Sequence, residues 1–223
     1  MCARYTLSKE EKKLLQAYEA KLIAPFEPSF NIAPTQTAAL ITADEPEWIQ
    51  QFHFGLVPFW AKDKKVGVSM LNARSETLLE KPAFKPLLLQ NKRCLVLADG
   101  FYEWKTEGKE KLPYRFILKT REVFAFAGLW SQWIDPVTKD PYRSFTILTT
   151  SPNDDVAELH NRMPVILSKE EEKVWLDGSV NPNDLLSLCD SYPADDMEKY
   201  RVSKEVNKVV NNHCNLILPA NSE

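Results

Sequence analysis

The sequence predicts an α+β fold in which mixed, largely antiparallel curved sheets form a barrel-like core flanked by helices. Short apolar strands outnumber helical segments, and the two kinds do not alternate as they do in a doubly wound sheet. Fifteen prolines against six glycines favour a loop-rich, extended chain over a helical bundle. No repeat or linker divides the chain, and its length suits one domain, so we expect a single domain over residues 1–223.

Capping residues and apolar periodicity predict five helices. The first begins with a capping box at Ser8-Lys9-Glu10-Glu11 and places Leu14, Leu15, Tyr18 and Leu22 on one face. The others are expected over residues 82–89, 152–159, 168–176 and 183–188. Ser151 and Ser168 are the expected N-caps of the third and fourth of these helices.

Short runs rich in branched and aromatic residues predict the strands. We expect them over residues 38–42, 48–54, 93–98, 114–118, 123–128 and 144–150. The turn Asp44-Glu45-Pro46 separates the first two. Residues 60–69 are polar and carry three lysines, so we expect an exposed loop there.

Composition excludes several classes of protein. The longest apolar runs are too short to span a bilayer, and the chain does not open with a signal peptide, so a cytoplasmic protein without a membrane partner is expected. The net charge of −3 provides no global field for nucleic acid, so any such binding needs a local patch. The four cysteines have no metal-ligand spacing; we expect neither a metal nor a cofactor, and Cys94 is expected in the core.

Cys2 directly follows the initiator Met1. Removal of Met1 would leave Cys2 with a free α-amine and a thiol on adjacent carbons, a pair that no internal cysteine offers. Such a pair adds to an aldehyde, first as an imine and then as a five-membered thiazolidine. Both groups are nearly reactive at neutral pH, with ordinary pKa values of ~7.7–8.0 and ~8.5. Taken alone, Cys2 is equally compatible with a small, buried apolar residue.

Four polar clusters stand at the ends of the expected strands and helices. Each one has a structural alternative: Asn72 as a turn residue, Glu103 as a solvent-facing strand residue, and His160 as a helix C-terminal residue without chemistry. The arginines are individually compatible with surface charges. The clusters are Cys2-Ala3-Arg4-Tyr5, Asn72-Ala73-Arg74-Ser75-Glu76, Asp99-Gly100-Phe101-Tyr102-Glu103-Trp104 and His160-Asn161-Arg162-Met163-Pro164.

Together these clusters resemble the SRAP family, the abasic-site-processing proteins named for the SOS-response-associated peptidase label. The resemblance covers nearly the whole chain. It also includes Asn31-Ile32-Ala33-Pro34, Trp60-Ala61, Val202-Ser203 and Asn207. Ala3 departs from the family pattern, which usually has glycine at this position.

The resemblance implies a mechanism. Cys2 would capture the open aldehyde of an abasic site in single-stranded DNA as a thiazolidine crosslink, which protects the lesion during the DNA damage response. His160 would open the sugar ring by acid–base chemistry, Glu103 would move the proton of the amine, and Asn72 would hold the amine or sugar by hydrogen bonds. The protein would be associated with the nucleoid when bound to damaged DNA.

The DNA contacts are also implied by the resemblance. Arg4, Arg74 and Arg162 would bind flanking phosphates. Phe59 and Trp60 would stack on or beside bases, although Trp60 is equally compatible with a core position. Thr149, at the end of the strand before the His160 helix, is a further candidate contact.

Two other classes of function stay open from the sequence. An N-terminal cysteine is also the nucleophile of amide-hydrolysing enzymes, so a peptidase with self-processing activity is one alternative. The other is a non-enzymatic module that only binds nucleic acid.

Overall fold

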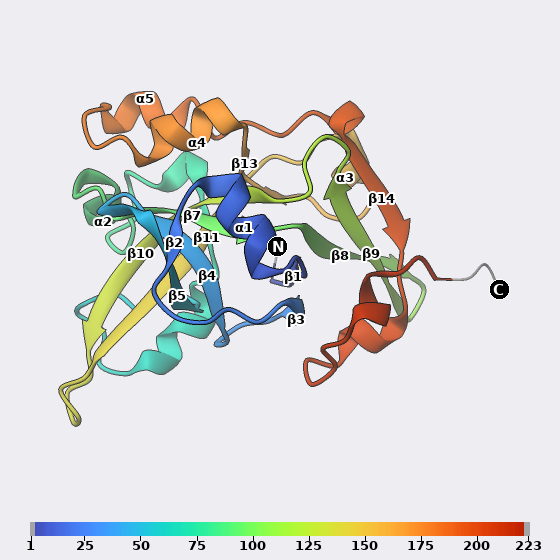
Figure 1. Ribbon diagram of the computed structural model, residues 1–223, viewed down its shortest axis with the longest axis horizontal. Helices are drawn as coiled ribbons and strands as arrows, with labels where there is room; N and C mark the ends of the chain where they lie inside the picture. Colours follow the sequence, from blue (N-terminus) through green and yellow to red (C-terminus); the bar gives the residue numbers. More distant parts are fainter. Residues whose placement is uncertain (1–2, 221–223) are drawn as a thin grey trace.

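A computed structural model describes residues 3–220 (Figure 1). The expected α+β class with largely antiparallel, curved sheets is confirmed. Two sheets lie side by side, and the helices pack around them. None of the helices within residues 3–220 is long and apolar enough to cross a membrane.

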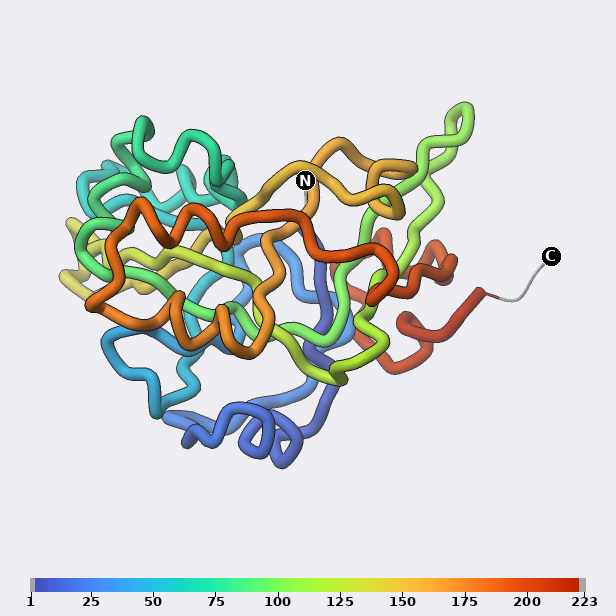
Figure 2. The backbone as a smooth tube through the Cα atoms, turned by 90° about the horizontal axis from the view of Figure 1, so that it is seen from above, coloured from blue at the N-terminus to red at the C-terminus, as the bar shows by residue number. Residues whose placement is uncertain are grey.

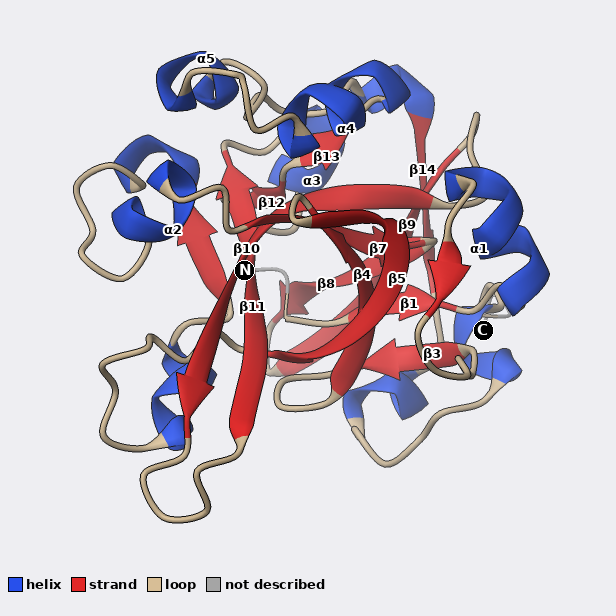
Figure 3. Cartoon of the chain, turned by 60° about the vertical axis from the view of Figure 1, so that its left-hand side comes forward, coloured by secondary structure: helices blue, strands red, loops and turns tan. Residues whose placement is uncertain are grey.

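The larger sheet closes into a five-stranded barrel (Figure 3). Its strands run in the order β11-β10-β7-β4-β5, and β5 then pairs in parallel with β11 through Ser144↔His53 and Phe145↔Phe54. The barrel strands are β4 (Thr37–Thr42), β5 (Glu45–Phe54), β7 (Arg93–Ala98), β10 (Phe124–Ile134) and β11 (Pro141–Thr150). Short strands extend it: β2 (Lys21–Leu22), β6 (Asn72–Arg74), β12 (Met163–Pro164) and β13 (Ile166–Leu167).

The second sheet is antiparallel throughout, in the order β14-β9-β8-β1-β3. Its strands are β1 (Tyr5–Leu7), β3 (Ser29–Ile32), β8 (Gly100–Glu107), β9 (Glu110–Leu118) and β14 (Met197–Arg201). The sequence predicted that the polar cluster over residues 99–104 follows a strand. In the structure most of this cluster lies in a second strand, β8, and one residue separates β8 from the end of β7. This single junction residue, Asp99, carries the chain from the barrel into the second sheet.

Aromatic rings fill the space between the two sheets. Tyr5 of β1 packs edge-on against Phe54 and Phe126 of the barrel, each with ring centroids 5.7 Å apart. Phe101 of β8 stacks on Phe116 at 4.9 Å. Buried aromatic pairs of this kind contribute beyond the area they bury. Cys94 is also buried in this core, as expected.

The helices are shorter than the sequence predicts, and the first begins later. They are α1 (Glu11–Tyr18), α2 (Lys85–Leu89), α3 (Asp154–Ala157), α4 (Lys169–Leu176) and α5 (Pro182–Leu186). The 3-10 helices are η1 (Lys64–Ser69), η2 (Ser75–Thr77), η3 (Ala194–Asp196), η4 (Lys204–Asn207) and η5 (Cys214–Ile217). The expected loop over residues 60–69 therefore contains η1.

Ser8 does not cap the first helix, so that prediction was wrong. Its backbone N–H and its hydroxyl both donate to Asp99 Oδ2, at 2.7 and 2.5 Å. The helix instead starts after Glu10, without a side-chain cap. Leu22 lies in β2 rather than on the helix. Asn153, not Ser151, caps α3, whereas the capping box of Ser168 and Glu171 on α4 is confirmed.

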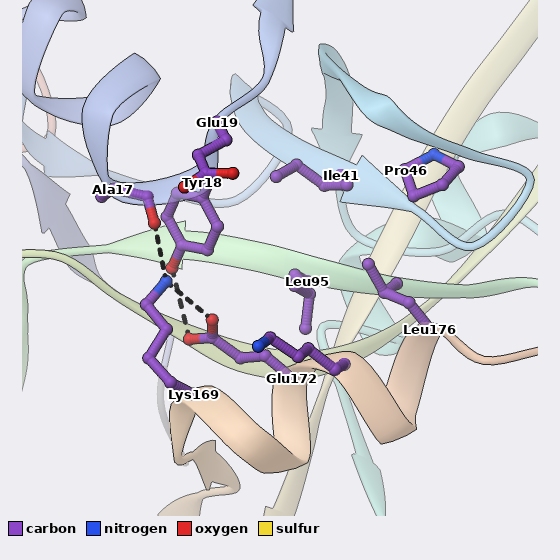
Figure 4. Close-up of a pocket in the computed structure, with 10 residues that line it drawn as sticks. Ala17, Tyr18, Glu19, Ile41, Pro46, Leu95, Lys169, Glu172 and Leu176 are labelled. Atoms are coloured by element: carbon purple, nitrogen blue, oxygen red, sulfur yellow. Dashed lines mark hydrogen bonds and ion pairs between the residues drawn. The ribbon is translucent and has the colours of Figure 1, made fainter.

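Helices α1 and α4 meet through a buried ionic cluster beside a hollow of about 370 Å³ (Figure 4). Glu172 accepts hydrogen bonds from Tyr18, Lys169 and Arg121. Lys169 also donates to the Ala17 carbonyl at 3.0 Å and lies over the Tyr18 ring. Burial raises the pKa of Tyr18, and the Glu172 charge adds to the rise. These contacts join α1 to α4, which packs against the barrel.

Asp99 is a buried carboxylate that joins three strands. Besides the two bonds from Ser8, it accepts a hydrogen bond from the Thr6 hydroxyl, and Arg115 lies 3.2 Å from Oδ1. The same guanidinium closes over Gly100, where a Cβ would stand 2.7 Å from Arg115 Nε. A side chain at position 100 would therefore have to displace this guanidinium from its contact with Asp99.

The first prediction concerns this cluster. Asp99→Asn keeps the shape but leaves the Arg115 guanidinium buried without a countercharge, so it should lower the free energy of unfolding by about 3–5 kcal/mol. The control is Asp44→Asn, which removes a partly exposed pair with Lys92 and should cost less than about 1 kcal/mol. Urea unfolding of the three proteins measures both. Equal, small losses would contradict the structural role of Asp99.

Candidate active site

A hollow of about 560 Å³ opens between the second sheet and the turn that follows α3. In Figure 2 the β8–β9 hairpin, in light green, lies beside the yellow-orange segment after β11. The hollow brings together Glu103 and His160, which are distant in sequence. Its lining residues are Ala3, Glu103, Trp104, Thr106, Lys111, Leu159, His160 and Asn207.

Cys2 and Met1 lie outside the described residues. Ala3 follows Cys2 directly and lines the hollow with Glu103 and His160. The residue that follows Cys2 in the sequence therefore belongs to the wall of the hollow.

Glu103 sits in β8 on the same side as Phe101, facing away from the neighbouring Tyr102 and Trp104. Only 3% of it is exposed. The solvent-facing alternative for this residue is therefore excluded. Burial raises the pKa of Glu103 to about 7, while a backbone hydrogen bond at Trp104 acts in the opposite direction. Near neutral pH this carboxyl group can both accept and release a proton.

His160 lies in the turn after α3, partly buried. Its Nδ1 accepts a hydrogen bond from the Arg162 backbone N–H at 3.0 Å. The Arg162 carbonyl oxygen is 3.2 Å from the same nitrogen. Burial lowers the pKa of His160, so the imidazole is mainly neutral at pH 7. The main chain of Arg162 therefore occupies Nδ1 of His160.

Asn72 belongs to β6, which pairs in parallel with the end of β11. It is partly buried and does not line the hollow around Glu103 and His160. Its segment is nevertheless joined to that of His160, because Glu76 forms an ion pair with Arg162. Asn72 thus stands next to the site rather than in its wall.

The three candidate phosphate ligands have different surroundings. Arg4 donates to Asn31 Oδ1 at 2.6 Å and to the Val206 carbonyl at 2.8 Å, and burial lowers its pKa. Arg162 is paired with Glu76. Arg74 is exposed, and its guanidinium has no hydrogen bond or ion pair with any residue from 3 to 220. Of the three, Arg74 has the charge most available to a ligand.

Phe59 and Trp60 are 67% and 54% exposed, so a core position for Trp60 is excluded. The indole N–H of Trp133 donates to the Ala61 carbonyl at 2.7 Å and anchors this loop to β10. Thr149 is fully buried. Its carbonyl accepts a hydrogen bond from Arg162, whereas its hydroxyl has no hydrogen-bond partner within residues 3–220.

Sequence reasoning missed part of the hollow. Trp104 is held by a hydrogen bond from its indole N–H to Asn207 Oδ1 at 2.7 Å. Asn207 was noted in the sequence but given no role. Thr106 and Lys111 are a cross-strand pair of the β8–β9 hairpin, and no local pattern marks them. The sequence analysis predicted a strand over residues 114–118 but no hairpin before it, so it gave no signal for these two residues.

No group of three or more His, Cys, Asp or Glu side chains within residues 3–220 is arranged to hold a metal ion. A carboxyl group and an imidazole, those of Glu103 and His160, line the hollow together.

The chain belongs to the SRAP family. The profile of this family, described as SOS response associated peptidase, matches residues 1–209. The chain is 45% identical to Abasic site processing protein YoqW of Bacillus subtilis (strain 168), over 97% of this chain and 99% of YoqW. It is 31% identical to Abasic site processing protein HMCES of Gallus gallus, over 87% of this chain and 67% of HMCES. A crystal structure of a protein from Bacteroides thetaiotaomicron superposes with a TM-score of 0.86 at 28% identity, over 92% of this chain and 93% of that chain.

The second prediction follows from the burial of Glu103. A carboxyl group whose pKa is raised by folding stabilises the protein below its unfolded pKa, and this contribution is lost as pH rises through the folded pKa. A rise from 4.5 to about 7 corresponds to about 3 kcal/mol. We compare the free energy of unfolding of Glu103→Gln with that of the wild type at each pH. The difference should shift in favour of the variant by up to about 3 kcal/mol between pH 4 and pH 8. Urea unfolding at both pH values tests this, and a pH-independent difference would refute it.

Proposed function

We propose that this protein captures abasic sites in single-stranded DNA as a covalent thiazolidine crosslink through Cys2, after removal of Met1. The observation that carries the proposal is the hollow in which Ala3, the residue after Cys2, is joined by Glu103 and His160. The names of the relatives support the substrate class. Shielding of the lesion during the damage response would follow from the covalent bond.

The chemistry needs no oxidant or reductant. Opening the closed sugar breaks the bond between C1′ and the ring oxygen; the ring oxygen gains a proton and the C1′ hydroxyl loses one. The α-amine of Cys2 then adds to the aldehyde and expels one water molecule to form an imine. The thiol adds to the imine carbon, its proton passes to the nitrogen, and the thiazolidine ring is complete.

His160 and Glu103 suit different steps. His160 would exchange protons with the sugar oxygens, since an imidazole is the commonest acid–base group and this one lines the hollow. Glu103 would take the proton from the ammonium group of Cys2. A carboxyl group with a pKa of about 7 can accept this proton near neutral pH and release it again in a later step. Holding the amine and thiol beside the aldehyde supplies a large effective concentration. Asn72 would orient the amine or the sugar.

The DNA would be held by a few contacts rather than by a general positive field. Arg74 is the best supported phosphate ligand, because its charge is exposed and unpaired within the described chain. Phe59 and Trp60 would stack against bases, because both rings are largely exposed on an anchored loop. Arg4, Arg162 and Thr149 remain candidate contacts, although all three already serve as links between segments.

The third prediction concerns the crosslink. Wild-type protein mixed with abasic single-stranded DNA should gain the mass of the DNA less one water molecule and stay attached on a denaturing gel. Cys2→Ala should form no such species, because it lacks the thiol that closes the ring. Cys214→Ala, which removes an exposed cysteine elsewhere, is the matched control and should crosslink normally.

Two outcomes would overturn this proposal. Equal crosslinking by Cys2→Ala would exclude Cys2 as the site of capture. Cleavage of unrelated peptides by the wild type, without an adduct on abasic DNA, would favour the peptidase alternative.

The fourth prediction separates the two acid–base groups. His160→Ala should slow capture of abasic DNA by roughly 10²–10⁴-fold but spare capture of a small aldehyde that is already open. Glu103→Gln should slow both reactions, because it acts on the amine. Stopped-flow rates with both substrates decide this, with melting temperatures recorded on the same preparations. Equal slowing of both substrates by His160→Ala would defeat the ring-opening role.

A further inference from the structure

Glu76 and Arg162 form a two-pronged ion pair beside the site. Arg162 Nη1 lies 2.6 Å from Glu76 Oε1, and Nη2 lies 2.8 Å from Oε2. Nη2 also donates to the Thr149 carbonyl at 2.5 Å. Such fork-to-fork pairs fix geometry as well as supplying energy. The pair therefore ties η2 to the end of β11 and to the turn that carries His160.

The backbone of Arg162 controls the imidazole of His160. A backbone N–H can only donate, so the bond from Arg162 N–H makes Nδ1 an acceptor in the neutral ring. The proton of the neutral ring is then on Nε2. In the charged ring, Nδ1–H can donate to the Arg162 carbonyl, 3.2 Å away. In either state Nε2 carries a proton.

The Arg162 side chain is committed within the protein. Its fork is occupied by Glu76 and Thr149, and its side chain is only 13% exposed. The Arg162 hydrogen bond lowers the pKa of Glu76, so this carboxylate stays ionised at neutral pH. The guanidinium group of Arg162 is thereby fixed in place, while the backbone N–H of the same residue is hydrogen-bonded to the His160 ring.

We propose that Glu76 is a positioning residue that, through Arg162, sets the orientation of the His160 ring and places the proton of the neutral ring on Nε2. The kinetic part of this inference rests on the proposed function, but the tautomer part does not. Glu76 touches neither the DNA nor the reacting atoms in this role. It acts by holding the turn in which the Arg162 N–H meets Nδ1.

The first arm of the test is spectroscopic and needs no DNA. The protein has three histidines, so long-range ¹H–¹⁵N spectra of labelled protein can be assigned with a His160→Gln variant. Wild type should show the Nε2–H tautomer of His160. Glu76→Ala should show a mixture of tautomers, and Glu76→Gln, which keeps one acceptor oxygen, an intermediate ratio. Glu80→Gln is the control, since it removes an exposed carboxylate nearby in sequence, and should match wild type.

The second arm is kinetic. Glu76→Ala should slow capture of abasic DNA roughly tenfold while leaving capture of a small open aldehyde within about twofold, as expected of a misplaced acid–base group. Affinity for undamaged single-stranded DNA should stay within about twofold of wild type. Glu76→Gln gives the same comparison if the alanine variant does not fold.

The outcomes are distinct. A wild-type tautomer in the folded Glu76 variants would overturn the inference whatever their crosslinking rate. Tighter DNA binding and faster capture by Glu76→Ala would also overturn it, because Glu76 would then compete with phosphate for Arg162. An altered tautomer in a protein whose wild type forms no adduct would refute the proposed function but leave the positioning role intact.

Discussion

The buried carboxylate of Asp99 is the contact on which the arrangement of this protein depends. It is the single residue between β7 of the barrel and β8 of the second sheet. Its bonds from Thr6 and Ser8 hold β1, and its charge offsets that of Arg115 in β9. β1 begins at Tyr5, three positions after Cys2 in the sequence. The same junction fixes β8, which carries Glu103.

The site combines two groups whose charged forms burial disfavours. Burial raises the pKa of Glu103 to about 7 and lowers the pKa of His160 below its ordinary value. Groups tuned in this way transfer protons efficiently near pH 7. The burial of Glu103 lowers the stability of the folded protein once this carboxyl group ionises. Such a conflict between activity and stability is common at active sites. Strong packing of the aromatic core between the sheets offsets this cost.

Two of the three candidate DNA-binding arginines also connect segments that are far apart in the sequence. Arg4 joins β1 to β3 and η4, and Arg162 joins the His160 turn to η2 and β11. Both side chains are partly desolvated and well supplied with acceptors. Arg74 differs, because its side chain is exposed and has no hydrogen bond or ion pair with another residue from 3 to 220. Arginines in similar motifs thus have different roles: Arg4 and Arg162 connect segments of the protein, whereas the charge of Arg74 is exposed to solvent. The difference depends on the acceptors around each guanidinium.

The sequence by itself determined the fold class, the capping box at Ser168, the candidate site residues and the positions of six strands, β4, β5, β7, β9, β10 and β11. These follow from local patterns: apolar alternation, capping residues and the reactivity of an N-terminal cysteine. Only the tertiary structure decided that Ser8 serves Asp99 instead of capping α1, that Glu103 is buried, and that Arg162 is held by Glu76. Each of these depends on a partner about 60 to 90 residues away, or on burial by both sheets. No local pattern encodes such a partner, because closure of the barrel and the crossover at Asp99 bring these segments together.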